Sequence, residues 1–569
     1  MFKKHPRGLM VLFFTEMWER FGFYLMLGIF TLYMIAGSGE KFAGLGMTEK
    51  HAADIYGSYL ALVYLTPFFG GLLADRILGY RRAIIMGGIL MATGYLLLAI
   101  PGSMVAFYVA LLVIILGNGL FKPNISVLLG KLYEKPEYEQ LKDSGFNIFY
   151  MGINIGAFVC NFVAAYLRIQ YGWGWAFAAA GIGMLIGVVW FVAGNFAVPN
   201  LKQADKIAQK RDTDMPLGQV FYKMFLPAIV FAVIGWLIPN NIFGADSTDA
   251  FIFLSIPLIG FYFNIWRTAD EREKNPIAAL LAVFGVVIVF WAIFHQNGSA
   301  LTYWARSYTD REAGPVLAKI LDKIEMSEEV STVPREVQRT GPHGEDLGIS
   351  MGPSYYFDNY GSLVPRGLTF KPDDVTDSDW QKIVPEERQE YGSLQLWPTE
   401  LQASINPFYI IIFTPLVVAF FGYLRRRNKE PSTPMKIGLG LFITAMSMLV
   451  MVVAAIVSGS GATKASVAWL FGVYGVITIG ELFLSPMGLS LVSKLSPKRI
   501  AALMMGGWFL STAIGNKMSG VLSGLWTSFD NKAYFFLTNT GLTMIAVIAI
   551  FSMMPWLKRV VAEHTELEQ

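Results

Sequence analysis

Three charged side chains fall within five residues of the first long apolar segment. Glu16 and Glu19 are three residues apart and Arg20 follows Glu16 by four, so in an α-helix all three lie on one broad face. A carboxyl group binds a proton more readily beside another carboxylate and less readily beside a guanidinium, so small changes in geometry can drive proton uptake or release. The spacing predicts a cluster that holds a movable proton. A static cluster of ion pairs that ties helices together is the alternative.

Four further ionisable residues lie inside apolar segments: Lys122, His295, Glu481 and Lys517. Such a residue is costly in lipid unless it faces a wet cavity or a partner, so each is a candidate for function. Lys122 and Glu481 each lie close to a proline, which can open the helix toward a cavity. Lys122 with Arg20 would form a positive pole and Glu481 a negative one, which suits a zwitterion such as a short peptide. His295 and Lys517, taken alone, are more often structural or snorkelling groups than relays.

The elements that carry these residues are long and apolar. Of 569 residues, 54% are hydrophobic and only 15% are charged, and the mean hydropathy is +0.47. This composition excludes an ordinary soluble enzyme and a disordered chain, and the single Cys160 excludes an internal disulfide framework. The net charge of +3 gives no reason to expect a nucleic-acid partner. Apolar windows of about 20 residues predict fourteen membrane-spanning helices, at residues 10–35, 53–74, 82–101, 105–130, 144–168, 175–196, 218–239, 250–266, 277–305, 401–424, 434–458, 465–493, 499–525 and 534–557.

Lys and Arg gather at the N-terminus, in every second connection and at the C-terminus. Because cytoplasmic loops collect these residues, both termini are predicted to be cytoplasmic, which agrees with an even number of helices. The start of the chain reads as a spanning helix rather than a cleaved signal, and no long tails follow. These features favour the inner membrane of a bacterium, although a plasma membrane would satisfy the same charge pattern.

One polar stretch, residues 306–399, interrupts the apolar pattern between the ninth and tenth predicted helices. It contains no apolar run long enough to span a bilayer, and its Pro, Gly, Asp and Glu content is typical of an external loop or small domain. A tolerated insertion and a regulatory or partner-binding role are both open.

Five short motifs occur in order along the chain: EMWERF at 16–21, GLLADR at 71–76, FKPN at 121–124, FYMGINIG at 149–156 and GELFLSP at 480–486. Together they resemble the signatures of the proton-dependent oligopeptide transporters of the major facilitator superfamily. The resemblance covers nearly the whole chain except residues 306–399.

The resemblance implies an all-α polytopic membrane protein with the major facilitator fold, two six-helix bundles and two extra helices between them. The N-terminal bundle would comprise residues 1–198. Residues 199–274 would form a cytoplasmic linker and the two extra helices. Residues 275–569 would form the C-terminal bundle, with 306–399 as an extracytoplasmic insertion between its first two helices.

The resemblance also implies roles for the charged residues. Glu16, Glu19 and Arg20 would couple to protons together with Lys122. Arg20 and Lys122 would hold a peptide carboxylate, and Glu481 would hold the amino group. Further positions match the lining of the family's substrate pocket: Tyr24, Tyr64, Asn154, Trp291, Asn406, Trp508 and Ser511.

Some positions match the family pattern and others depart from it. Asp75 and Arg76 match an inner latch, with a solvated charge pair at a helix end as the alternative. Many members carry an outer gate pair of an Arg and an acid at the positions that hold Leu27 and His295 here. Since losing the Arg alone would strand a buried carboxylate, the joint change is physically coherent. His295 could replace the missing acid as a proton site, or could simply pack between helices. Phe23 stands where the family often has Tyr, which removes one hydroxyl from the pocket.

The predicted function is therefore proton-coupled import of di- and tripeptides by alternating access, with peptide-like drugs as further candidate substrates. A monomer is the expected oligomeric state. No enzyme activity and no cofactor are expected, since the sequence has no Walker-type motif and no convincing metal-ligand cluster. One rival is a carrier of another small anion or an amino acid, such as nitrate. Glu481 discriminates between them, because a pure anion has no use for a carboxylate. Another rival is a receptor-like membrane protein that uses residues 306–399.

Overall fold

The computed structural model describes residues 5–37, 42–100, 102–134, 136–139, 141–197, 217–331, 336–340, 346–351, 354–357, 363–366, 393–461, 463–497 and 500–568. A helix is present at each of the fourteen predicted segments. Within the described residues, eleven helices are long and apolar enough to cross a membrane. The other three predicted segments correspond to α1 (Gly8–Ile35), which carries the three internal charges, α10 (Leu226–Trp236) and α19 (Ala501–Gly524). The chain is a multi-pass membrane protein.

The first six predicted segments pack against one another. After α1 come α2 (Glu49–Leu73), the π-helical turn η2 (Ala74–Leu78), α3 (Tyr80–Leu98), α4 (Met104–Leu132), the short α5 (Pro136–Glu139), α6 (Lys142–Tyr171) and α7 (Trp173–Ala197). α1 packs against both α6 and α7, while α4 contacts α2 and α3. The approach of α6 to α1 is close: a Cβ on Gly156 would lie 2.4 Å from the carbonyl oxygen of Met17. This packing surrounds the charged part of α1 with protein rather than lipid.

Two helices connect the halves. The first is built from α9 (Leu217–Val220), the π-helical turn η3 (Phe221–Phe225) and α10, and the second is α11 (Asp246–Arg267). α10 packs against α11, and α11 in turn contacts α2, α12 and α19. The carboxylate of Asp249 accepts hydrogen bonds from the backbone N–H groups of Ile242 and Phe243, at 2.7 and 2.8 Å. The turn between the two helices is thus fixed by one buried side chain.

The last six predicted segments form the second group of helices. They are α12 (Glu271–Phe294) with the 3₁₀ turn η4 (His295–Gly298) and α13 (Ala300–Ser307), then η6 (Thr399–Ser404) with α16 (Ile405–Arg426), α17 (Thr433–Val457), η7 (Gly459–Gly461), α18 (Ala468–Leu495), α19 with η9 (Leu525–Ser528), and α20 (Lys532–Glu568). The sequence predicted one continuous helix over 277–305, which is wrong at residues 295–298. The turn allows a close contact, because a Cβ on Gly298 would lie 2.0 Å from the hydroxyl oxygen of Tyr56 on α2.

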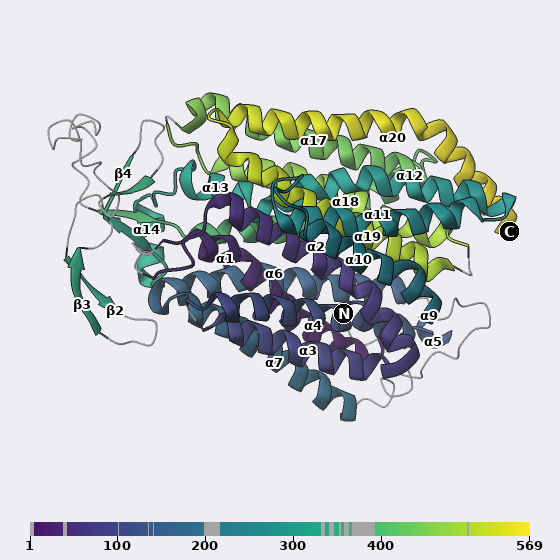
Figure 1. Cartoon of the computed structure of the whole chain (residues 1–569), viewed down its shortest axis with the longest axis horizontal. Coiled ribbons are helices and arrows are strands. Elements are labelled where there is room, and N and C mark those ends of the chain that lie inside the picture. Colours follow the sequence, from purple (N-terminus) through teal and green to yellow (C-terminus); the bar gives the residue numbers. More distant parts are fainter. Residues whose placement is uncertain are drawn as a thin grey trace.

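The polar stretch between α13 and η6 contains a small helix and short strands. These are α14 (Pro315–Lys323), β1 (Glu328–Ser331), β2 (Glu336–Thr340), β3 (Asp346–Met351), β4 (Ser354–Phe357), β5 (Leu363–Arg366) and β6 (Ser393–Leu396). One sheet has the order β5-β4-β1-β6, and β2 and β3 pair separately. β1 pairs with β6 in antiparallel fashion. We call residues 308–398 the insertion. Its strands stand at one end of the helices (Figure 1), so the all-helical architecture is that of the membrane part.

The two groups of helices lie side by side, with the purple and blue helices on one side and the green and yellow helices on the other (Figure 1). α2 packs along α19, and α6 contacts η6 and α16. The α2–α19 contact depends on glycine, since a Cβ on Gly57 would lie 2.7 Å from the Cα of Gly520. The architecture is that of two six-helix bundles with two additional helices. The exact domain boundaries stay predictions, and residues 198–216 lie outside the described residues.

Candidate functional site

A charged cluster lies inside α1. Glu16, Glu19 and Arg20 are 4%, 0% and 3% exposed. The guanidinium of Arg20 donates to both carboxylate oxygens of Glu19, and its Nε lies 3.5 Å from Oε1 of Glu16. Oε2 of Glu16 is buried and makes no hydrogen bond within the described residues. The three side chains therefore meet as predicted, with Arg20 held by Glu19 and one acceptor on Glu16 left open.

Lys122 lies on α4 beside this cluster. Its ammonium is 4.0 Å from the ring centroid of Tyr64, and the charges of Glu16, Glu19 and Arg20 act on it. Lys122 makes no ion pair within 4.0 Å among the described residues. The helix continues through Pro123 to Leu132. The ammonium is thus held on an aromatic face, a contact worth about 0.5–2 kcal/mol, rather than by a carboxylate.

Aromatic rings link the two halves next to Lys122. Tyr64 on α2 lies 6.4 Å from Trp291 and 5.7 Å from His295, measured between ring centroids. His295 stacks on Trp291 at 5.1 Å with an angle of 22° between the rings. Nε1 of Trp291 and Nδ1 of His295 are buried and make no hydrogen bond within the described part of the chain. Both rings therefore keep polar atoms available beside the cation.

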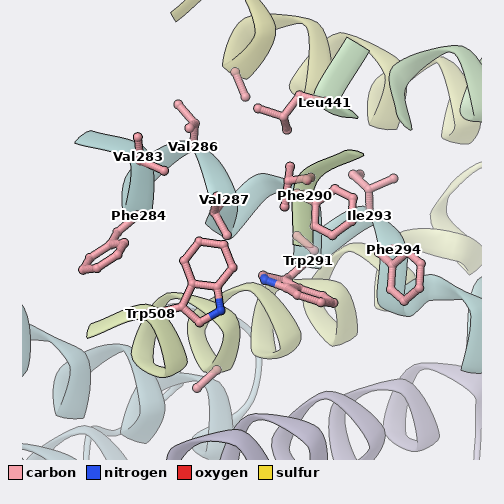
Figure 2. Close-up of a cluster of buried hydrophobic side chains, with 14 of the residues drawn as sticks. Val283, Phe284, Val286, Val287, Phe290, Trp291, Ile293, Phe294, Leu441 and Trp508 are labelled. Carbon is pink, nitrogen blue, oxygen red and sulfur yellow. The ribbon is translucent and has the colours of Figure 1, made fainter. Parts of the chain in front are cut away.

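Trp508 and Ser511 occupy a different environment. Figure 2 shows Trp508 and Trp291 within the apolar cluster of the second bundle, together with Phe284. The ring of Trp508 packs on the backbone of α18, where a Cβ on Gly488 would lie 1.8 Å from it. The hydroxyl of Ser511 donates to backbone carbonyls of its own helix at 2.9 and 3.1 Å. These two residues pack within the second bundle, and their part in a pocket stays a prediction.

The opposite charge is supplied by α18. The side-chain amide of Asn406 donates to Oε2 of Glu481 at 3.1 Å and to the hydroxyl of Thr478 at 2.9 Å. The charge of Glu481 acts on Tyr24 and Tyr64, which belong to the first bundle. The carboxylate is therefore oriented by Asn406 within the second bundle.

Two other predicted positions are placed less fully. Asn154 lies on α6, and its amide donates to the backbone oxygen of Tyr150 at 2.9 Å. The carboxylate of Asp75 accepts a hydrogen bond from the hydroxyl of Tyr80, across the π-helical turn η2. The side chain of Arg76 lies outside the described residues, so the latch that pairs it with Asp75 is untested.

Sequence reasoning did not find a buried ion pair between the halves. Nζ of Lys517 on α19 lies 2.6 Å from Oδ1 of Asp54 on α2, and also donates to Ser58 and Ser247 at 2.7 and 3.0 Å. The hydroxyl of Thr248 at the start of α11 donates to the same carboxylate at 3.0 Å. Lys517 is thus a structural cation that joins three parts of the chain. The available signal was the acid near the start of the second apolar segment.

A second missed pair joins Arg168 on α6 to Glu400 in η6. Glu400 is 0% exposed, and its carboxylate accepts two hydrogen bonds from the Arg168 guanidinium, at 2.6 and 3.2 Å. Both residues stand at the ends of predicted spans, where a charge is ordinary. Only the packing of α6 against η6 reveals that the pair is buried and joins the two halves.

Within the described residues, no group of three or more His, Cys, Asp and Glu side chains could hold a metal ion.

A comparison with models of known protein families shows which family this chain is related to. A family model described as PTR2, the POT family, matches residues 81–322 and 386–541. The chain belongs to the POT family. Its members are secondary transporters rather than enzymes, so the chain is a secondary transporter.

Individual relatives match the chain over almost its full length. The chain is 30% identical to the uncharacterized transporter YclF of Bacillus subtilis strain 168, over 98% of this chain and 95% of that protein. It is 29% identical to the di-/tripeptide transporter of Lactococcus lactis subsp. lactis strain IL1403, over 97% of this chain and 96% of that protein. A crystal structure of a variant of the peptide transporter POT in complex with alafosfalin superposes with a TM-score of 0.73, at 29% identity, covering 98% of this chain and 96% of that chain.

Proposed function

We propose that this POT family member imports di- and tripeptides together with protons by alternating access. The inner membrane of a bacterium, with both termini cytoplasmic, is its proposed location, and a proton gradient rather than a cofactor drives it. The observation that carries the proposal is a cation and a carboxylate in opposite halves: Lys122 is held on Tyr64 of the first bundle, and Glu481 is oriented by Asn406 in the second. A substrate with an amino group at one end and a carboxylate at the other satisfies both poles.

Each pole has a stated role in the proposal. Lys122 and Arg20 bind the peptide carboxylate, and Glu481 binds the amino group. The guanidinium of Arg20 is hydrogen-bonded to the Glu19 carboxylate, so it can bind a peptide only when those hydrogen bonds break. Protonation of the Glu16 and Glu19 cluster would release it, which couples proton binding to peptide binding. The other lining residues are Tyr24, Tyr64, Asn154, Trp291, Asn406, Trp508 and Ser511.

His295 offers a second proton site. The ring of His295 lies 5.7 Å from the ring of Tyr64, which also holds the charged ammonium of Lys122. A peptide carboxylate bound to Lys122 would offset that charge, so peptide and proton would favour each other's binding. His295 would in this way take over from the acid that the family usually carries at its position.

The test is uptake of a labelled dipeptide and tripeptide into liposomes that contain the purified protein, with and without an inward proton gradient. The wild-type protein is expected to accumulate peptide above equilibrium only with the gradient, and Glu481→Gln is expected to abolish accumulation. The matched control is Glu430→Gln, which neutralises a carboxylate in the connection between α16 and α17. Uptake that only equilibrates would contradict proton coupling, and no peptide uptake would contradict the substrate.

The rival functions give different results in the same assay. An anion carrier would transport nitrate and would tolerate Glu481→Gln, since a pure anion needs no carboxylate. A receptor that works through the insertion would lose its function on deletion of residues 310–395, whereas a transporter would still take up peptide, although at a changed rate.

A further inference from the structure

The end of the molecule that carries the insertion holds the two bundles together without the family's usual gate pair. The positions of that pair are Leu27 and His295, which cannot form an ion pair of an arginine and an acid. Other contacts join the bundles at this end instead. The side chain of Asn161 donates to the hydroxyl of Ser404 at 3.0 Å, and that hydroxyl donates to the carbonyl oxygen of Phe158 at 2.8 Å. The closure at this end must therefore rest on other residues.

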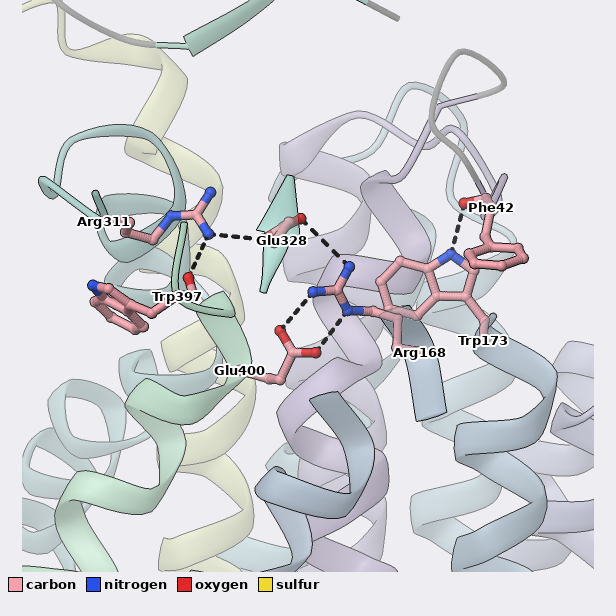
Figure 3. A network of polar contacts seen from close by, with 7 residues as sticks. All are labelled: Phe42, Arg168, Trp173, Arg311, Glu328, Trp397 and Glu400. Atoms are coloured by element: carbon pink, nitrogen blue, oxygen red, sulfur yellow. Dashed lines mark hydrogen bonds and ion pairs between the residues drawn. The ribbon is translucent and has the colours of Figure 1, made fainter. Parts of the chain in front are cut away.

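Arg168 joins the two bundles at this end through its guanidinium. Its guanidinium is held by both oxygens of Glu400 in the other half, and the ring of Trp173 lies 5.4 Å from it. Trp173 is itself fixed, because its indole N–H donates to the carbonyl oxygen of Phe42 at 2.9 Å (Figure 3). A bidentate pair of this kind has one geometry, so it reports whether the two halves are together.

The insertion adds a second carboxylate to the same guanidinium. Oε1 of Glu328 lies 3.5 Å from Arg168, and its other oxygen accepts a hydrogen bond from Arg311 at 2.9 Å. Arg311 also donates to the carbonyl oxygen of Trp397 at 2.9 Å (Figure 3). Since β1, which begins at Glu328, pairs with β6, the carboxylate is anchored to the second bundle while it contacts the first.

Apolar packing supports these polar contacts. Ala165 on α6 shares a small buried cluster with Ala313, Leu321 and Met326 of the insertion. The side-chain amide of Gln170, also on α6, donates a hydrogen bond of 2.8 Å to the backbone oxygen of Glu325. The insertion is covalently part of the second half, yet this cluster rests on a helix of the first.

We propose that Arg168, Glu400 and Glu328 form the gate at the insertion end, and that residues 311–328 of the insertion keep it closed by docking on α6. The proposal rests on the proposed alternating access, because only a carrier that opens at this end needs a gate there. Opening must break the contacts of Arg168 and withdraw the docked segment from α6. The insertion then acts as a working part of the carrier that sets how often this end opens.

The experiment measures the separation of the two halves directly. Cys160 is the only cysteine in the chain, so a Cys160→Ser protein accepts spin labels at two chosen sites. Val105 at the start of α4 and Val457 at the end of α17 are 75% and 66% exposed and belong to different halves. Distance distributions between labels at these sites, in lipid nanodiscs without peptide, give the populations of closed and separated states.

Glu328→Gln is expected to raise the separated population about threefold, as for a partly exposed ion pair. Glu400→Gln should raise it about tenfold or more, because that pair is buried. Glu430→Gln is the matched control: Glu430 also bridges two cations, Arg425 and Lys436, but both lie in its own half. Its distance distribution should equal that of the wild-type protein.

A further variant separates a gate residue from a residue that merely supports the insertion. In a protein that already carries Arg168→Met, Glu328→Gln should cause no further rise in the separated population. If Glu328 acted only through Arg311, Glu328→Gln would still raise the separated population in that protein. An unchanged distribution in Glu328→Gln, or an equal shift in Glu430→Gln, would overturn the proposal. The distance measurements need no peptide, so they test the gate independently of transport. If the wild-type protein took up no peptide, the proposed function would be overturned, but the proposed gate would still be tested by the distances.

Discussion

Charges are arranged differently in the centre of the molecule and at its insertion end. In the centre, Lys122 rests on the ring of Tyr64 and one oxygen of Glu16 has no hydrogen bond within the described residues. At the insertion end, Lys517 and Arg168 each hold a carboxylate of the opposite half. Among the described residues, the centre thus keeps a cation without an ion pair and a carboxylate oxygen without a hydrogen bond, whereas the insertion end uses its charges to hold the halves together.

The largest expected effect is on the paired end. Lys517→Met would leave Asp54 without its cation, which should lower the free energy of unfolding by about 3 kcal/mol, as for a broken buried ion pair. The double variant Asp54→Asn with Lys517→Met should recover most of this loss, since no charge then remains unpaired. Thermal unfolding in detergent measures both, with Lys494→Met on the exposed side of α18 as the control. A double variant as unstable as the single one would show that the pair does not hold the end together.

The second prediction concerns the centre. Lys122→Met is expected to reduce peptide uptake by roughly 30-fold or more, which corresponds to about 2 kcal/mol for a lost charged partner of the substrate. Folding stability should change little, because Lys122 makes no ion pair within the described residues. Uptake assays and thermal unfolding on the same preparation check both parts. Lys274→Met, which removes an exposed cation paired with Glu271, should alter neither. A large loss of stability in Lys122→Met would erase the contrast between the two regions.

Features that depend on neighbouring residues in the chain could be predicted from the sequence, whereas contacts between distant helices could not. The fourteen helices follow from apolar runs of bilayer length, and the cluster of Glu16, Glu19 and Arg20 follows from helical spacing. The pairing of Arg168 with Glu400 could not be predicted, because it depends on which helices of the two halves meet. The 3₁₀ turn at His295 was missed for the same reason, since it accommodates Tyr56 on a distant helix.

The third prediction tests whether His295, in the centre, binds a proton. His295→Gln keeps a polar side chain on Trp291 but removes the site for a proton. The pH dependence of peptide uptake is expected to weaken by about threefold, less than 1 kcal/mol of coupling. Uptake measured at several external pH values checks this, with Gln296→Ala as a neighbouring change that removes no titrating group. An unchanged pH profile would make His295 a packing residue.

The smallest expected effect is the response of the insertion end to acid. Burial alone would raise the pKa of Glu328, but Arg168 and Arg311 outweigh it and lower the pKa to about 2. Arg425 and Lys436 likewise lower the pKa of Glu430 to about 2, by hydrogen bonding. Because the pKa of Glu328 is lowered, its ionised carboxylate stabilises the docked state at any pH above 4.5, the ordinary pKa of a glutamate. This stabilisation is lost as the pH falls from 4.5 toward 2.

The separated population between spin labels at Val105 and Val457 should therefore stay constant from pH 8 to about pH 5 and rise below it. Glu328→Gln should remove the part of this rise that belongs to the docked segment, whereas Glu430→Gln should leave the rise unchanged. A transition near neutral pH that Glu328→Gln abolishes would contradict this assignment. An insertion end that does not respond between pH 5 and 8 would agree with the proposed coupling of protons at the centre, where the carboxylates of Glu16 and Glu19 share one guanidinium.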